Sequence, residues 1–281
     1  MKMLFLVAVW LCAFQTFVSC DAGQGVETTT VIQPPMKLWY DKPATEWMTS
    51  ALPIGNGELG AMFFGGVAKE QVQFNEKTLW SGNQDVRGAY QNFGDLYLTF
   101  DGHDTYSDYR RELCLDEAIG TVSYKIGDVR YLREYFASYP DQVIVMRISV
   151  PDKKQKLTFS IDLADGHDGT TSYSENSMMV KGKLNLISYE AQVRVINKGG
   201  TLAWDHDNIS VQEADEVLIL LTAATNYDIS SDSYIGETEE QLHDRLSRRM
   251  ATIAGKSFDE LKKNHLEDYQ PMYDRVKLDL G

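Results

Sequence analysis

The sequence predicts a mainly β protein, built as a sandwich of antiparallel strands and followed by two C-terminal helices. Between Lys37 and Tyr227, short runs of β-branched and aromatic residues are broken by Gly, Asp, Asn and Pro at the spacing of sandwich strands. Beyond that stretch the apolar residues recur at steps of three and four, which is the period of a helix.

The first residues predict a secretory signal over 1–20. Lys2 precedes a mostly apolar run from Met3 to Val18, which is shorter than the roughly 20 residues of a membrane-spanning helix. Small residues follow, and two outcomes are open: Cys20 is the acylated first residue of a lipoprotein, or cleavage occurs after Ala22. We therefore expect an exported bacterial protein, either periplasmic or held at the membrane by a lipid anchor alone.

Residues 21–36 predict an extended leader, because this segment is rich in Gly, Thr and Gln and ends in Pro34-Pro35. Cys12 leaves with the signal, so Cys20 to Cys114 is the one disulfide that remains possible, and a disulfide scaffold is excluded. The formal net charge of −14 repels phosphate backbones, which excludes nucleic acid as a partner. A neutral ligand such as a sugar is compatible with this charge.

The strand pattern is clearest between Thr121 and Val150. Val122, Tyr124 and Ile126 alternate with polar residues, and turns at Gly127-Asp128 and Pro140-Asp141 separate three strands of a meander. Four further strands are expected, at Leu157–Leu163, Met178–Leu184, Tyr189–Ile196 and Glu216–Ala223. The last is almost entirely apolar, which predicts burial on both faces.

Two amphipathic helices are predicted in the tail, each starting with a capping box. The boxes are Thr238 with Gln241 and Ser257 with Glu260. The first apolar stripe is Leu242, Leu246, Met250 and Ile253, and the second is Phe258, Leu261, His265, Tyr269, Met272 and Val276. Pro271 is expected to kink or end the second helix. We expect both stripes to need a large helical partner that the 281 residues do not supply.

Two kinds of short motif are better explained by turns than by ligand sites. Gly55 to Gly60 matches the glycine spacing of dinucleotide sites, but Ala61 to Gly66 indicates a strand and a turn where that site needs a helix. The segments starting at Asp101, Asp165 and Asp205 combine Asp and His with Gly or Asn, yet each lies between strands and lacks the ligand order of a calcium or zinc site. We assign no metal ligand, cofactor or catalytic residue.

The segment Asn75 to Asn83 has the composition of a sugar site. Sugar recognition uses an aromatic ring against the C–H face and amide or carboxylate contacts to hydroxyls, and Trp80 stands beside Asn75, Glu76 and Asn83. Residue types alone favour a core role for Trp80 and a turn role for Asn75.

The same residues resemble the N-terminal domain of glycoside hydrolase family 95, the α-L-fucosidases that also include α-L-galactosidases. The resemblance spans nearly all the mature chain and rests on an ordered set of segments: Ala51 to Met62, Asn75 to Gly82, Gly94 to Leu96, Tyr109 to Leu113, Arg133 to Ser138 with Pro140-Asp141, Asp268 to Gln270, and Arg275 to Gly281.

The resemblance implies a β super-sandwich over 37–230 and a helical linker over 231–281, which stops before an (α/α)₆ catalytic barrel. In relatives the catalytic glutamic acid, asparagine and aspartate lie in that barrel. The resemblance therefore assigns no catalytic residue to this sequence. Asn56, Glu76 and Trp80 are then expected near the barrel mouth, at the domain interface rather than in direct contact with sugar. Two departures are the short segment between Trp80 and Gly94 and Glu58 at a position where arginine is common.

The function expected from the sequence is therefore a non-catalytic scaffold domain of an exported α-L-fucosidase or α-L-galactosidase that acts on fucosylated glycans. Two alternatives remain open at this point. One is a free-standing carbohydrate-binding module, which would bury its helical stripes against its own strands. The other is the N-terminal domain of a family 65-like glycoside phosphorylase, which shares the sandwich.

Overall fold

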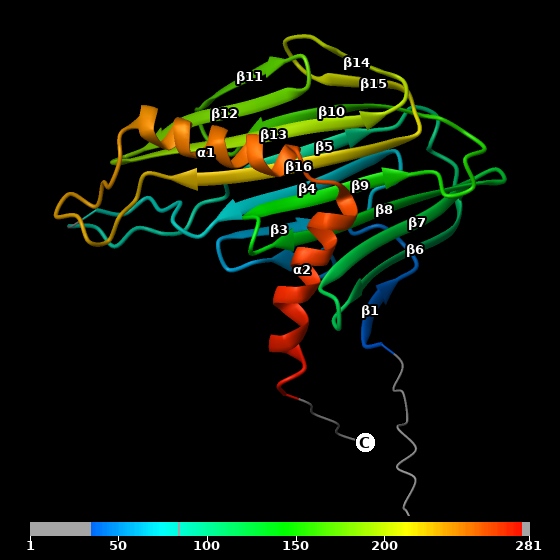
Figure 1. The fold of residues 1–281 in the computed structure, drawn as a ribbon, viewed down its shortest axis with the longest axis horizontal. Coiled ribbons are helices and arrows are strands. Elements are labelled where there is room, and N and C mark those ends of the chain that lie inside the picture. Colours follow the sequence, from blue (N-terminus) through cyan, green and yellow to red (C-terminus); the bar gives the residue numbers. More distant parts are fainter. Residues whose placement is uncertain (1–34, 84, 277–281) are drawn as a thin grey trace, which may run out of the picture. The chain divides into compact units, whose positions relative to one another are not determined.

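Residues 35–83 and 85–276 are described by a computed structural model, and in this part of the chain two antiparallel sheets pack face to face (Figure 1). The larger sheet has nine strands in the order β1-β6-β7-β8-β9-β16-β13-β12-β11. Its strands are β1 (Lys37–Tyr40), β6 (Ser107–Cys114), β7 (Ile119–Ile126), β8 (Val129–Ser138), β9 (Val143–Ser149), β11 (Thr170–Ser174), β12 (Ser177–Leu184), β13 (Ile187–Lys198) and β16 (Glu216–Thr225). The predicted mainly β, antiparallel fold is confirmed.

The smaller sheet has seven strands in the order β14-β15-β10-β5-β4-β3-β2. Its strands are β2 (Leu52–Gly55), β3 (Leu59–Phe63), β4 (Lys69–Glu76), β5 (Gly94–Thr99), β10 (Leu157–Asp165), β14 (Thr201–Trp204) and β15 (Ile209–Ala214). The signal predicted over 1–20 and the lipidation site at Cys20 lie outside the described residues, as does nearly all of the leader.

Strand β16 shows how the larger sheet is buried on both faces. Val217, Ile219 and Leu221 point into the core between the sheets, whereas Leu218 and Leu220 point to the opposite face and pack under the helices. The alternation follows from the period of two in a strand. The prediction that this apolar run is a doubly buried strand is confirmed.

The two helices begin where the capping boxes place them. Helix α1 (Glu239–Ala254) is capped by Thr238 with Gln241, and α2 (Phe258–Tyr273) is capped by Ser257 with Glu260. Pro271 does not end α2, which runs two residues further to Tyr273. No helix in the described part of the chain is long and apolar enough to cross a membrane.

The expectation that both helical stripes need an outside partner is wrong for most of their length. Figure 1 shows both helices on one face of the nine-stranded sheet, where α1 contacts β13 and β16 and α2 contacts β8. The stripe of α1 is fully buried, and Phe258 and Leu261 of α2 are buried beside Phe136. Only the end of the second stripe is exposed to solvent, since Met272 is 53% exposed and Val276 is 79% exposed.

A buried polar group ties the two sheets together, and we call it the inter-sheet network: Glu70, Arg133, Tyr124 and Tyr135. Arg133 of β8 pairs with Glu70 of β4 at 3.0 Å and donates to the Tyr124 hydroxyl at 2.8 Å, while the Tyr135 hydroxyl donates to Glu70 at 3.0 Å. The other carboxylate oxygen of Glu70 accepts from the Gly65 amide at 2.8 Å. Both carboxylate oxygens of Glu70 thus have partners inside the core, whereas the Nε atom of Arg133 has none among the described residues.

Candidate functional site

The glycine-rich segment at Gly55 forms the β2–β3 hairpin, as the turn interpretation predicts. Gly55 ends β2 and pairs with Gly60 of β3, and Gly57 lies in the turn with a φ of +86°, which favours glycine. A strand, not a helix, follows the last glycine. The geometry that a dinucleotide site needs is therefore not formed here.

The three Asp-containing segments also form turns between strands. The carboxylate of Asp165 accepts from the backbone amides of His167 and Gly169, and the carboxylate of Asp205 accepts from those of Asp207 and Asn208. These are the local bonds that make Asp a turn former. In the first segment His103 is buried, and its Nδ1 lies 3.1 Å from the Tyr124 hydroxyl.

Asn56 is placed in the β2–β3 turn, where its whole side-chain amide is used inside the protein. The Oδ1 atom accepts from the amides of Glu58 and Leu59, and Nδ2 donates to the Ser138 carbonyl at 2.8 Å. The side chain therefore holds the hairpin to the end of β8. It is a structural amide in this geometry.

Glu76 ends β4 and lies beside the same hairpin, since it pairs with Leu59 of β3. Its side chain is 5% exposed, and one carboxylate oxygen accepts from both the amide and the hydroxyl of Thr78. Burial raises the pKa of Glu76, and the two bonds from Thr78 oppose that rise. The Thr78 hydroxyl also meets that of Thr225, so Glu76 anchors the start of the following loop to the end of β16.

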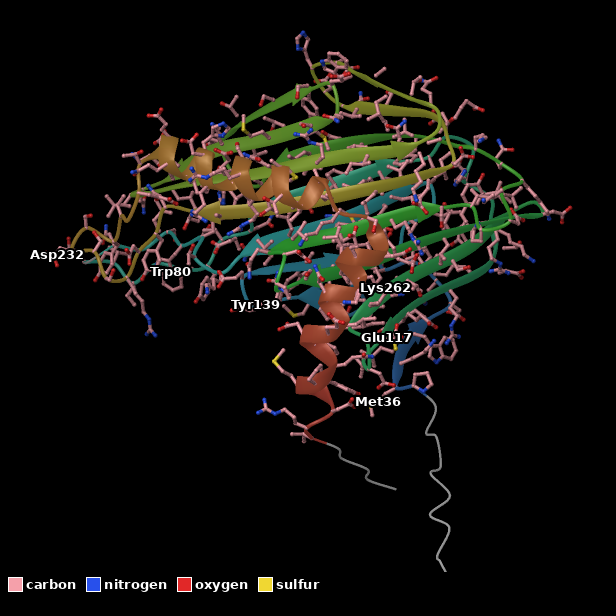
Figure 2. All side chains as sticks on the ribbon, in the orientation of Figure 1. Met36, Trp80, Glu117, Tyr139, Asp232 and Lys262 are labelled. Carbon is pink, nitrogen blue, oxygen red and sulfur yellow. The ribbon has the colours of Figure 1, made fainter. Side chains whose placement is uncertain are left out.

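Trp80 is half-buried and faces a hollow between three loops, near the end of the sandwich where Figure 2 labels Trp80 and Asp232. The loops are the one after β4, the β12–β13 turn and the one after β16. The cavity measures about 380 Å³, a size within the range of small-ligand sites. We call it the aromatic pocket, and its lining is Lys77, Thr78, Trp80, Gly82, Asn83, Tyr90, Leu186, Ile187, Tyr227, Ile229 and Tyr234.

The rings of the aromatic pocket form two pairs. Trp80 meets Tyr90 edge to face, with ring centres 4.7 Å apart and planes at 88°. Tyr227 and Tyr234 stack at 6.1 Å with planes at 13°. Trp80 was expected from the sequence, whereas Tyr90, Tyr227 and Tyr234 were not. The available signal was aromatic residues within turn-rich segments, but nothing local shows that the ends of β4 and β16 meet.

Asn56 and Glu76 both lie beside the β2–β3 hairpin, whereas Trp80 lies in the loop after β4 and is the one of the three that faces the pocket. Its lining holds no carboxylate among the described residues. A separate hollow beside α1 does hold Asp168, Glu190 and Glu239. There Glu190 is bound by Lys181, His243 and Gln192, so its oxygens are already occupied.

The sequence matches one family model, described as glycosyl hydrolase family 65, N-terminal domain, over residues 38–88 and 83–230. Among curated proteins, an alpha-L-fucosidase 2 of Arabidopsis thaliana is 32% identical over 88% of this chain. A probable alpha-fucosidase A of Aspergillus niger is 28% identical over 86% of it. The chain spans 37% and 38% of the length of these two relatives.

Among solved structures, a putative kojibiose phosphorylase from the human microbiome has a similar fold. The TM-score is 0.54 at 12% identity, over 86% of this chain and 39% of that one. This likeness concerns the fold of the sandwich and helices.

Proposed function

Because the chain belongs to the family of glycosyl hydrolase family 65 N-terminal domains, we propose that it is the non-catalytic scaffold domain of an exported glycoside hydrolase. The full-length protein removes terminal α-L-fucosyl or α-L-galactosyl units from glycans, as a member of family 95. The fucosidase names of the two relatives and the ordered segments from Ala51 to Gly281 support this assignment.

The observation that carries the non-catalytic role is where the carboxylates lie. Glycoside hydrolysis in most families needs two acidic side chains facing a sugar. In the described residues the aromatic pocket has no carboxylate in its lining. The five carboxylates that are buried in this part of the chain are all bonded to internal groups, and they are Glu70, Glu76, Glu134, Asp141 and Glu190. The chemistry then belongs to an (α/α)₆ barrel in the same polypeptide, with a fucosylated glycan as substrate.

The proposal places Asn56, Glu76 and Trp80 close to the barrel mouth. Asn56 and Glu76 act indirectly, because their polar atoms fix the β2–β3 hairpin and the loop after β4. Trp80 is the one of the three whose ring is available to a partner. Export through residues 1–20 remains part of the proposal, either with acylation of Cys20 or with cleavage after Ala22.

A free-standing carbohydrate-binding module is the second candidate, and one observation favours it. Such a module buries its helical stripes against its own strands, and α1 together with the first half of α2 does so. The exposed Met272 in the last turn of α2 and Val276 just beyond the helix favour the scaffold, because they leave apolar surface for a further domain. A family 65-like phosphorylase is the third candidate, supported by the family match.

The test is release of sugar by the purified 281-residue chain. We expect no fucose from a nitrophenyl α-L-fucoside or from fucosyllactose, with or without inorganic phosphate. Free fucose would show that the chain is itself a hydrolase, whereas a phosphate-dependent reaction that yields a sugar 1-phosphate instead of free fucose would show a phosphorylase. Reading the gene downstream of Gly281 separates the first two candidates, since a frame that continues into a helical domain supports the scaffold and a stop codon supports the module.

A further inference from the structure

We propose that the aromatic pocket binds one neutral hexose or deoxyhexose residue of an oligosaccharide, as a site that this chain forms alone. The binding does not depend on which reaction the full-length protein performs, and it assigns the exposed face of Trp80 to a sugar rather than to the surface of a barrel. The structure supports it through the rings, the loops that hold them and the charge of the lining.

The rings are the first support. Folding normally buries aromatic side chains, yet Tyr90 is 67% exposed, and Leu186 and Ile229 beside it are 48% and 77% exposed. Together with Trp80, Tyr227 and Tyr234 they surround a hollow of about 380 Å³. A concave aromatic surface accepts the C–H face of a pyranose, and the aliphatic side chains offer a contact for a sugar methyl group.

The loops are the second support, because backbone and amide bonds hold them in place without using the rings. The Asn83 carboxamide oxygen accepts from the amides of Asp85 and Val86, and the Asn185 amide donates to the Ser81 carbonyl. In the third loop the Asp228 amide donates to the Tyr234 carbonyl at 2.9 Å. The pocket is thus formed before a ligand arrives, which lowers the entropy lost on binding.

The remaining polar groups are the third support. Among the described residues no hydrogen bond engages the hydroxyls of Tyr90, Tyr227 or Tyr234, so all three are available to sugar hydroxyls. Lys77 at the rim is paired with Glu58, so the lining has no free cation for an anionic ligand among the residues that the structure describes. With a net charge of −14 on the chain, a neutral ligand is the one that fits.

Calorimetric titration of the full chain with L-fucose, D-galactose and fucosyllactose tests the proposal. We expect saturable binding of at least one of them, with affinity lowered about tenfold or more by Trp80→Ala, since aromatic anchors dominate small sites. Trp204→Ala is the matched control, because Trp204 is 52% exposed on β14 and lies outside the pocket lining. It should bind as the parent chain does.

Tyr90→Ala guards against a folding artefact, because this largely exposed ring can be removed with little effect on the melting temperature. Loss of sugar binding at an unchanged melting temperature supports the site. Two results would overturn it: no saturable heat with any of the three sugars, or parental affinity in both pocket variants. Fucose release by the chain would contradict the proposed function and leave the binding result intact, so the two failures can be told apart.

Discussion

The inter-sheet network and the aromatic pocket use similar side chains in opposite ways. In the network, Tyr124 and Tyr135 are fully buried and each hydroxyl has a partner in Arg133 or Glu70. In the pocket, the tyrosines keep ring surface in contact with solvent and their hydroxyls are left for a ligand. The contrast shows that the hydrogen bonds of a tyrosine hydroxyl help to tell a core residue from a binding residue. Burial of the ring alone does not separate the two roles.

The largest expected effect is on the network itself. Glu70→Gln leaves the Arg133 charge buried without its carboxylate, which should lower the free energy of unfolding by about 3–5 kcal/mol in urea titrations. Adding Arg133→Met to that variant should recover part of the loss, since the uncompensated charge is then gone. A single variant as stable as the parent would mean that the pair is not what holds the sheets together.

The same contrast can be tested within helix α2. Leu261 is fully buried, so Leu261→Ala should cost roughly 3 kcal/mol through the cavity that it leaves. Met272→Ala on the same helix should change the free energy of unfolding by less than about 0.5 kcal/mol, because Met272 is 53% exposed. Equal losses from the two variants would contradict the half-buried arrangement of α2.

The buried His103 beside the inter-sheet network should make the stability of the chain depend on pH. Burial, with the nearby Arg133 charge, lowers the pKa of His103 from 6.5 to about 4. The neutral ring therefore contributes stability that is fully present above pH 6.5 and is lost as the pH falls toward about 4. His103→Asn should remove about 2 kcal/mol of the parent's acid-induced loss in this window. Identical pH profiles of unfolding in parent and variant would show that His103 does not titrate with folding.

The smallest effect is expected in the aromatic pocket. Tyr90→Ala should alter the free energy of unfolding by about 1 kcal/mol or less, because its ring is 67% exposed and the variant loses mainly the edge-to-face contact with Trp80. Thermal unfolding followed by circular dichroism measures it. A loss as large as that of Leu261→Ala would make the ring part of the core and would remove the contrast between the two regions.

Local sequence signals were sufficient for several elements. Both capping boxes lie at the helix starts, because side chain and backbone bond across three residues. The three strands between Thr121 and Val150 were found from alternation and from the turns at Gly127 and Pro140. In each case the deciding interaction joins neighbours in the chain.

Long-range pairing was not predictable from those signals. No residue near Phe258 in the sequence indicates that β8 and β9 would cover it, so the helices were expected to need another domain to pack against. The ion pair of Glu70 with Arg133 joins residues 63 positions apart, and only the registers of both sheets bring them together. The aromatic pocket was missed for the same reason, apart from Trp80 and Asn83.

The place of β16 in the nine-stranded sheet has a consequence for how the chain acquires its structure. Among the strands of the described residues this one is made last, yet it lies between β9 and β13 and pairs with both. The meander of β6 to β9 and the ribbon of β11 to β13 must each wait with an unpaired edge until residues 216–225 arrive. Contacts of such wide sequence separation slow folding, so the nascent polypeptide is most prone to aggregate just before this strand emerges from the ribosome.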